Sequence, residues 1–151
     1  FANVLNDLWT SINELAKHPE GLETRGAFVQ SAVIFMNRSN LIMEQMNNYQ
    51  LNLNKQVTDT IDRVNAIGKE INELNKTIVQ YESSGDNAND YRDQRNALLD
   101  ELSTYVGISY RDDQYGNTFV KVEGQDFVSL NYVYELDVEQ AAPLSPMISP
   151  I

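Results

Sequence analysis

The residues able to carry out chemistry are few and scattered along the chain. One histidine, His18, and no cysteine occur among 151 residues. A zinc site needs several His, Cys or carboxylate ligands, and a nucleophilic triad needs a histidine beside its nucleophile. His18 stands next to Pro19 and close to Gly21, so we interpret it as an exposed turn residue. We therefore expect no metal, no cofactor, no small-molecule substrate and no catalytic residue, and the chain is predicted not to be an enzyme.

An acidic cluster near the middle of the chain could be mistaken for a calcium loop. It consists of Asp86, Asp90 and Asp93. An EF-hand loop that began at Asp86 would need an oxygen ligand at its third position and glycine at its sixth, where this sequence has Ala88 and Tyr91. We attribute the cluster to helix capping and solvation instead.

The overall charge limits the classes of partner. Eleven basic residues against twenty-two acidic ones give a formal net charge of −11. Nucleic acids and anionic membranes attract Lys and Arg, so neither is expected as a partner. No apolar run approaches the roughly 18 residues of a membrane-spanning helix. The chain begins with Phe1 and shows no signal peptide, and we interpret it as a fragment of a longer protein.

A seven-residue repeat is the strongest structural signal. Apolar residues recur at its first and fourth positions, which predicts one gently supercoiled helix from about Leu22 to Tyr81. At 1.5 Å per residue such a helix would be roughly 90 Å long. The apolar positions are Val29, Ala32, Met36, Met43, Met46, Leu53, Val57, Val64, Ile67, Ile71, Leu74, Ile78 and Tyr81. This stripe predicts either a self-associating coiled coil or packing against the chain's own helices. We favour the second, because regular opposite-sign charges do not flank the stripe.

The remaining patterns complete a mainly α fold, an elongated helical bundle or rod with a small β-hairpin region near the C-terminus. Helices are expected at about 2–16, 22–81 and 90–105, within a helical domain of residues 1–106. Alternation with a period of two predicts a small antiparallel region at 107–138, with a hairpin turn at Gly124-Gln125 and a further strand at 132–138. Residues 139–151 carry three prolines and are expected to form a linker or extended tail.

One segment resembles a known family, that of the flagellar hook-filament junction proteins, the first hook-associated proteins. The family carries a stretch of the form D-Q-R-D-x-L-L-D-E-L-S. The matching residues here are Asp93, Gln94, Arg95, Leu98, Leu99, Asp100, Glu101, Leu102 and Ser103. Upstream, the family's I-N-x-L-N pattern matches Ile71-Asn72-Glu73-Leu74-Asn75, and Arg25 after the proline corner also fits.

The resemblance implies a structural role without catalysis. It implies an extracellular place in the bacterial flagellum, reached through the flagellar secretion apparatus. It also implies hook protein, the second junction protein and copies of the same protein as partners. Terminal helices that this chain lacks are then expected to cover an exposed assembly stripe that includes some of Met36, Met43, Met46 and Leu53. The alternatives are another flagellar axial protein, such as the second junction protein or flagellin, a coiled-coil adaptor unrelated to flagella, and, last, an acidic-site enzyme.

Overall fold

The computed structural model describes residues 1–138, so the tail expected at 139–151 lies outside the described residues. The chain divides into two compact units, residues 1–55 and 56–151, and one helix runs through both. This helix, α2, spans Leu22–Ser83 and is continuous through the Asn- and Gln-rich segment at its centre. The long heptad helix predicted from the sequence is thereby confirmed.

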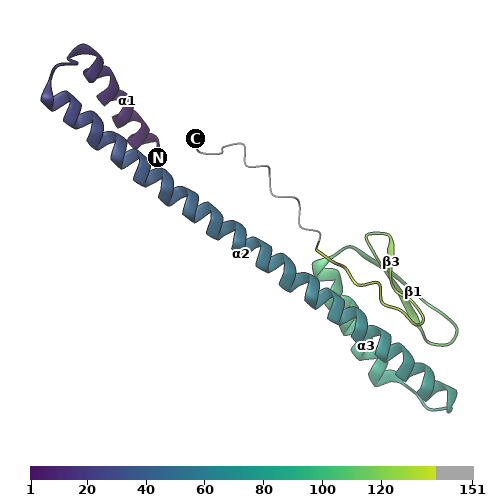
Figure 1. The fold of residues 1–151 in the computed structure, drawn as a ribbon. Helices are drawn as coiled ribbons and strands as arrows, with labels where there is room; N and C mark the ends of the chain where they lie inside the picture. Colours follow the sequence, from purple (N-terminus) through teal and green to yellow (C-terminus); the bar gives the residue numbers. More distant parts are fainter. Residues whose placement is uncertain (139–151) are drawn as a thin grey trace. The chain divides into compact units, whose positions relative to one another are not determined.

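The first unit is a helical hairpin. Helix α1 (Ala2–Lys17) lies beside the first part of α2 (Figure 1), and the rings of Phe1 and Phe35 approach to 5.5 Å between centroids. The corner between the helices is held by side chains. Thr24 Oγ1 donates to the carbonyl oxygen of His18 at 2.8 Å, and Arg25 Nε donates to that of Pro19 at 2.8 Å. Arg25 thus closes the proline corner that precedes it.

Helix α1 has two apolar faces. Val4, Leu8 and Leu15 are half-buried, whereas Leu5 and Trp9 are exposed. Residues i and i+1 lie about 100° apart around a helix, so one neighbouring helix covers only one of the two rows.

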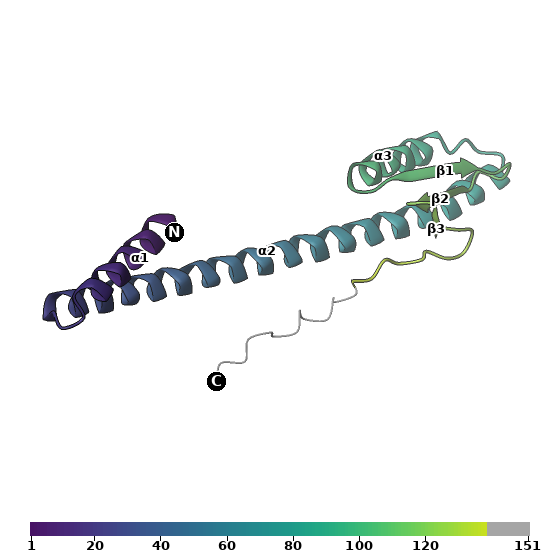
Figure 2. The same ribbon diagram turned by 90° about the horizontal axis from the view of Figure 1, so that it is seen from above.

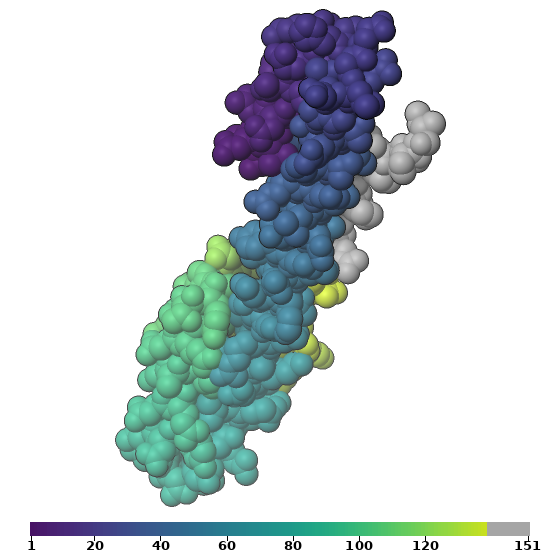
Figure 3. Space-filling view, turned by 90° about the vertical axis from the view of Figure 1, so that its left-hand side faces the viewer, coloured from purple at the N-terminus to yellow at the C-terminus, as the bar shows by residue number. Residues whose placement is uncertain are grey.

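The second unit is built from the rest of α2, the helix α3 (Asn89–Tyr105) and a small sheet. The antiparallel strands are β1 (Ile108–Asp112), β2 (Thr118–Val122) and β3 (Gln125–Val128), in the order β1-β2-β3. Figure 2 shows α3 and the strands beside the C-terminal part of α2, and in Figure 3 the atoms of α3 lie directly against that part of α2. The core consists of Val64, Ile67, Ile71, Leu99, Leu102, Val120, Val122, Phe127 and Val128.

Local chemistry differs from the sequence prediction in three places. The two-residue hairpin turn is Glu123-Gly124, not Gly124-Gln125, and both residues have positive φ, as a type I′ turn requires. Helix α3 begins after Ala88 without a side-chain cap. The segment predicted as a fourth strand makes only an isolated bridge between Val128 and Val133.

Candidate functional site

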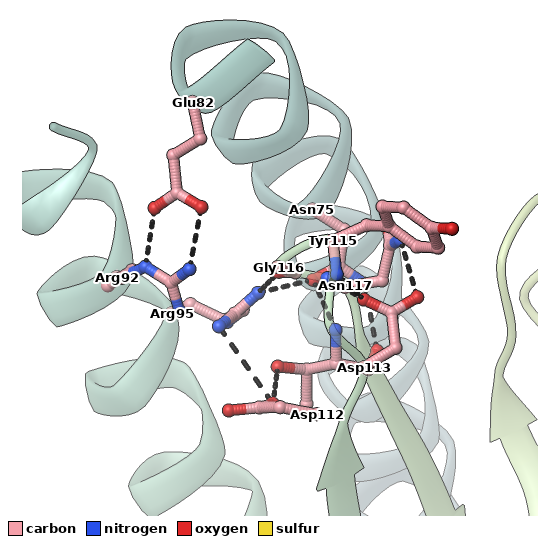
Figure 4. Close-up of polar contacts among 10 residues, drawn as sticks. Asn75, Glu82, Arg92, Arg95, Asp112, Asp113, Tyr115, Gly116 and Asn117 are labelled. Carbon is pink, nitrogen blue, oxygen red and sulfur yellow. Dashed lines mark hydrogen bonds and ion pairs between the residues drawn. The ribbon is translucent and has the colours of Figure 1, made fainter. Parts of the chain in front are cut away.

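A buried arginine lies where α3 meets α2 and the β1–β2 hairpin. Arg95 is only 2% exposed. Its Nη1 donates to Asn75 Oδ1 at 2.8 Å and to the carbonyl oxygen of Gly116 at 2.6 Å, and its Nη2 lies 4.0 Å from Asp112 Oδ1 (Figure 4). Burial lowers the pKa of Arg95, and the nearby Asp112 carboxylate opposes that effect. A buried charge needs such partners, so this side chain ties three elements together.

Asn75 connects α2 to β2 as a neighbouring strand would. Its Nδ2 donates to the carbonyl oxygen of Thr118 at 2.8 Å, and its Oδ1 accepts from the backbone N–H of Thr118 at 3.0 Å. The same Oδ1 accepts from Arg95. The side chain is buried, and both ends of its amide are bonded. Removing it would leave backbone and guanidinium groups unpaired.

Two further asparagines on α2 hold the chain beyond β2. Asn65 exchanges two hydrogen bonds with the backbone of Leu136, at 2.9 and 2.8 Å. Asn72 Nδ2 donates to the carbonyl oxygen of Ser129 at 3.0 Å. The motif of the resemblance includes Asn72 and Asn75 but not Asn65. The signal was present, because Asn65 and Asn72 are seven residues apart and so share one helix face.

The loop between β1 and β2 is ordered by one aspartate. Asp113 Oδ1 accepts from the backbone N–H groups of Tyr115 and Asn117 at 2.8 and 2.9 Å, and Oδ2 accepts from Asn117 Nδ2 at 2.9 Å (Figure 4). Burial alone would raise the pKa of Asp113, but these hydrogen bonds hold it below its ordinary value. Gly116 has φ +91°, and a Cβ there would lie 3.0 Å from Ile78. The glycine therefore lets the loop lie close against α2.

Two ion pairs, each between an arginine and a glutamate, join α2 to α3. Arg92 Nε and Nη2 each donate to one oxygen of Glu82 at 2.8 Å, and Arg63 Nε and Nη2 each donate to one oxygen of Glu101 at 2.7 Å. The bidentate geometry is the strong form of this interaction. The hydrogen bonds from the arginines hold the pKa values of both glutamates below their ordinary range.

The residues of the resemblance motif divide between the inside and the outside of the second unit. Arg95, Leu99 and Leu102 are buried, and Leu98 is partly buried against the core. Glu101 forms the ion pair with Arg63. The exposed members are Asp93, Gln94, Asp100 and Ser103. The structure thus brings together the inward half of the motif and leaves its outward half on the surface.

The expected assembly stripe lies in the first unit. Met36, Met43 and Met46 are 59–62% exposed and Leu53 is 41% exposed. Within residues 1–138, no three His, Asp or Glu side chains are placed so that they could hold a metal ion. In the same part of the chain, no helix combines the length and apolar character that crossing a membrane requires.

The polar groups of the second unit thus hold helices and strands in place. Fold and site together define a helical scaffold domain that carries a small sheet. Over residues 1–148 the chain matches the family described as "Flagellar hook-associated protein FlgK helical domain". The chain belongs to this family.

Two known proteins show the same likeness. Flagellar hook-associated protein 1 of Bacillus subtilis (strain 168) is 32% identical over 123 residues, which cover 81% of this chain and 24% of that protein. The structure of the flagellar hook junction protein FlgK from Burkholderia pseudomallei has the same fold, with a TM-score of 0.79 and 24% identity. That match covers 89% of this chain and 24% of the other. The chain therefore spans about a quarter of the length of each relative.

Proposed function

We propose that this chain is the helical part of a structural subunit that joins hook to filament in the bacterial flagellum. The observation that carries the proposal is the family match over residues 1–148. The names of the two relatives, a hook-associated protein and a hook junction protein, support it. So do the structural hydrogen bonds of Arg95 and Asn75, which connect different elements, and of Asp113, which orders the β1–β2 loop. In this role the protein acts by contact, without catalysis.

The proposed partners are hook protein, the second junction protein and copies of the same subunit. The proposed place is outside the cell, in the flagellar axis, after export through the flagellar secretion apparatus. The acidic composition suits such a role, because it keeps a subunit soluble before it docks on other proteins. It does not suit a partner that is itself rich in phosphate.

The assembly stripe gives this role a surface. We propose that Met36, Met43, Met46 and Leu53 are covered by terminal helices of the parent protein. Four large apolar side chains exposed along one helix exceed the isolated apolar residues that a monomer's surface normally carries. Covering a Met or Leu fully contributes about 1.5–3 kcal/mol. Burial of these four side chains under a helix would therefore stabilise the assembled protein by several kcal/mol.

The test is to delete the gene that encodes the parent protein from its bacterium and then to restore the gene. Deletion of the parent gene should leave hooks without attached filaments and release flagellin into the medium, and the intact gene should restore filaments and swimming. A fluorescently labelled parent protein should appear at the distal end of the hook. Normal filaments in the deletion strain, or label confined to the cytoplasm, would rule out the junction role.

A further inference from the structure

The outer face of the small sheet carries an arginine laid over an aromatic ring. The guanidinium carbon of Arg111 in β1 lies 4.5 Å from the ring centroid of Phe119 in β2. Beside this pair is a hollow of about 470 Å³, also lined by Ser109, Lys121 and Asp126. A guanidinium stacked on a ring keeps its N–H edge free for a carboxylate. The hollow is therefore a place where an acidic side chain can be received against an apolar floor.

Arg111 stands apart from the other basic residues of its unit. Within residues 56–138 it alone lies outside ion-pair distance of every carboxylate. The others are Arg63, Lys69, Lys76, Arg92, Arg95 and Lys121. In a chain with a net charge of −11, an unpaired guanidinium on an open face selects an acidic partner.

The complementary surface is present on the same chain. Along its outer ridge, α3 exposes Asp93, Ala97 and Asp100. Neither aspartate forms an ion pair within residues 1–138. Residues spaced by four and three lie on one side of a helix, so the ridge presents two carboxylates with a small residue between them. The small residue allows the helix to lie close against another surface.

We propose that the sheet face of one copy receives the α3 ridge of a second copy, with Asp93 of the second copy at Arg111 of the first. The spacings agree. From Arg111 to Ser109 along β1 is about 6.7 Å, and from Asp93 to Ala97 along α3 is about 6 Å. Ala97 then lies over Ser109. Lys121, which pairs with Ser109 across the strands, lies within reach of Asp100 while keeping its own contact with Asp126.

The contact joins two different surfaces, so each copy keeps one of each free. Such a head-to-tail contact closes into a ring or continues as a filament. It rests on the proposed function, which brings copies of the subunit together. Its chemistry, however, belongs to the 151-residue chain alone and can be tested without flagella.

The absence of cysteine from the chain allows a direct test. Two single-cysteine variants, Ser109→Cys and Ala97→Cys, are mixed in equal amounts at high protein concentration and low salt in a glutathione redox buffer. Random pairing would give twice as much mixed dimer as either homodimer. We expect the mixed dimer to exceed that ratio about fivefold, the scale of one exposed ion pair, and to lose the excess in high salt. A random ratio at low salt would overturn the proposal.

Swapping the charges of Arg111 and Asp93 distinguishes this contact from the binding of any other acidic group in the hollow. Arg111→Glu in the Ser109→Cys chain should remove the excess, and Asp93→Arg in the Ala97→Cys chain should restore it. The controls Arg38→Glu and Asp86→Arg change the same charges at exposed positions elsewhere and should leave the excess unchanged. Circular dichroism verifies that each variant is folded. Loss of the excess without rescue would show that Arg111 does not meet Asp93 of a second copy and would overturn the proposal. A normal excess together with intact filaments in the deletion strain would instead reject only the junction role.

Discussion

Buried polar side chains connect the helices and strands that surround the apolar core of the second unit. Arg95 is the most demanding of them, because its charge is accommodated only by Asn75, Gly116 and the neighbouring Asp112. Truncating it leaves the buried carbonyl oxygen of Gly116 without its donor, removes one of the two donors to Asn75 Oδ1 and opens a cavity. Arg95→Ala should therefore lower the free energy of unfolding by about 3 kcal/mol, measured by urea unfolding followed by circular dichroism. The control Arg111→Ala removes only an exposed ring contact and should cost about 1 kcal/mol or less. If both variants lost the same free energy of unfolding, the hydrogen bonds of Arg95 would not be important for connecting these elements.

Two glycines of α2 make a matched pair. A Cβ on Gly68 would lie 2.6 Å from a ring carbon of Phe127 and 2.9 Å from Val133, whereas a Cβ on Gly26 would meet nothing within 4 Å. Alanine favours a helix interior over glycine by about 1 kcal/mol. Gly26→Ala should raise the melting temperature. Gly68→Ala should lower it, since the sheet must shift outward at a cost of about 1–3 kcal/mol. The same direction for both variants in a thermal scan would show that Gly68 is not required for close packing.

The connection between α2 and α3 should weaken in acid. The pKa values of Glu82 and Glu101 are lowered in the folded chain by Arg92 and Arg63, while the ordinary value is 4.5. A lowered pKa means that the stabilisation is fully present above the ordinary value and is lost as the pH falls below it. The double variant Glu82→Gln/Glu101→Gln should therefore show a shallower fall in melting temperature between neutral pH and acid. A profile that matches the parent chain would exclude these pairs as a source of acid sensitivity.

The order and approximate length of the elements could be predicted from the sequence. The exact turns and the side-chain contacts between elements could not. The heptad stripe predicted α2 to within two residues of its observed end at Ser83, because its signal is repeated over many turns. The turn predicted at Gly124-Gln125 lies one residue earlier, at Glu123-Gly124. Gly124 fits either position of a two-residue loop, and the register of the strands decides which position it takes. The resemblance motif includes Arg95, but its partner Asn75 lies 20 residues earlier in the chain and no local pattern links the two.

For the whole molecule, the proposed assembly stripe separates folding from incorporation. Met43 and Met46 are exposed, so Met43→Asp/Met46→Asp should leave the melting temperature of the isolated chain nearly unchanged. In the parent protein the same change should abolish incorporation at the hook tip, seen by fluorescence, because carboxylates would have to be buried under the terminal helices. The control Gln45→Asp/Asn48→Asp adds the same charges on another face of α2 and should incorporate normally. Unfolding of the isolated chain by the Met43/Met46 change would show that both residues belong to its core.

Helix α2 also has an unusual distribution of protection from water. Isolated helices exchange their amide hydrogens fastest at the ends, where the turns fray. In α2 the half-buried and buried side chains lie in its first and last parts, whereas every side chain from residue 43 to residue 59 is exposed. Asparagine and glutamine there favour the helix weakly. Deuterium uptake followed by mass spectrometry should therefore be fastest at the centre of α2 and slowest between Val64 and Ile78. A subunit with such a helix is stiffest where the helix is packed and most compliant along the exposed centre of the helix.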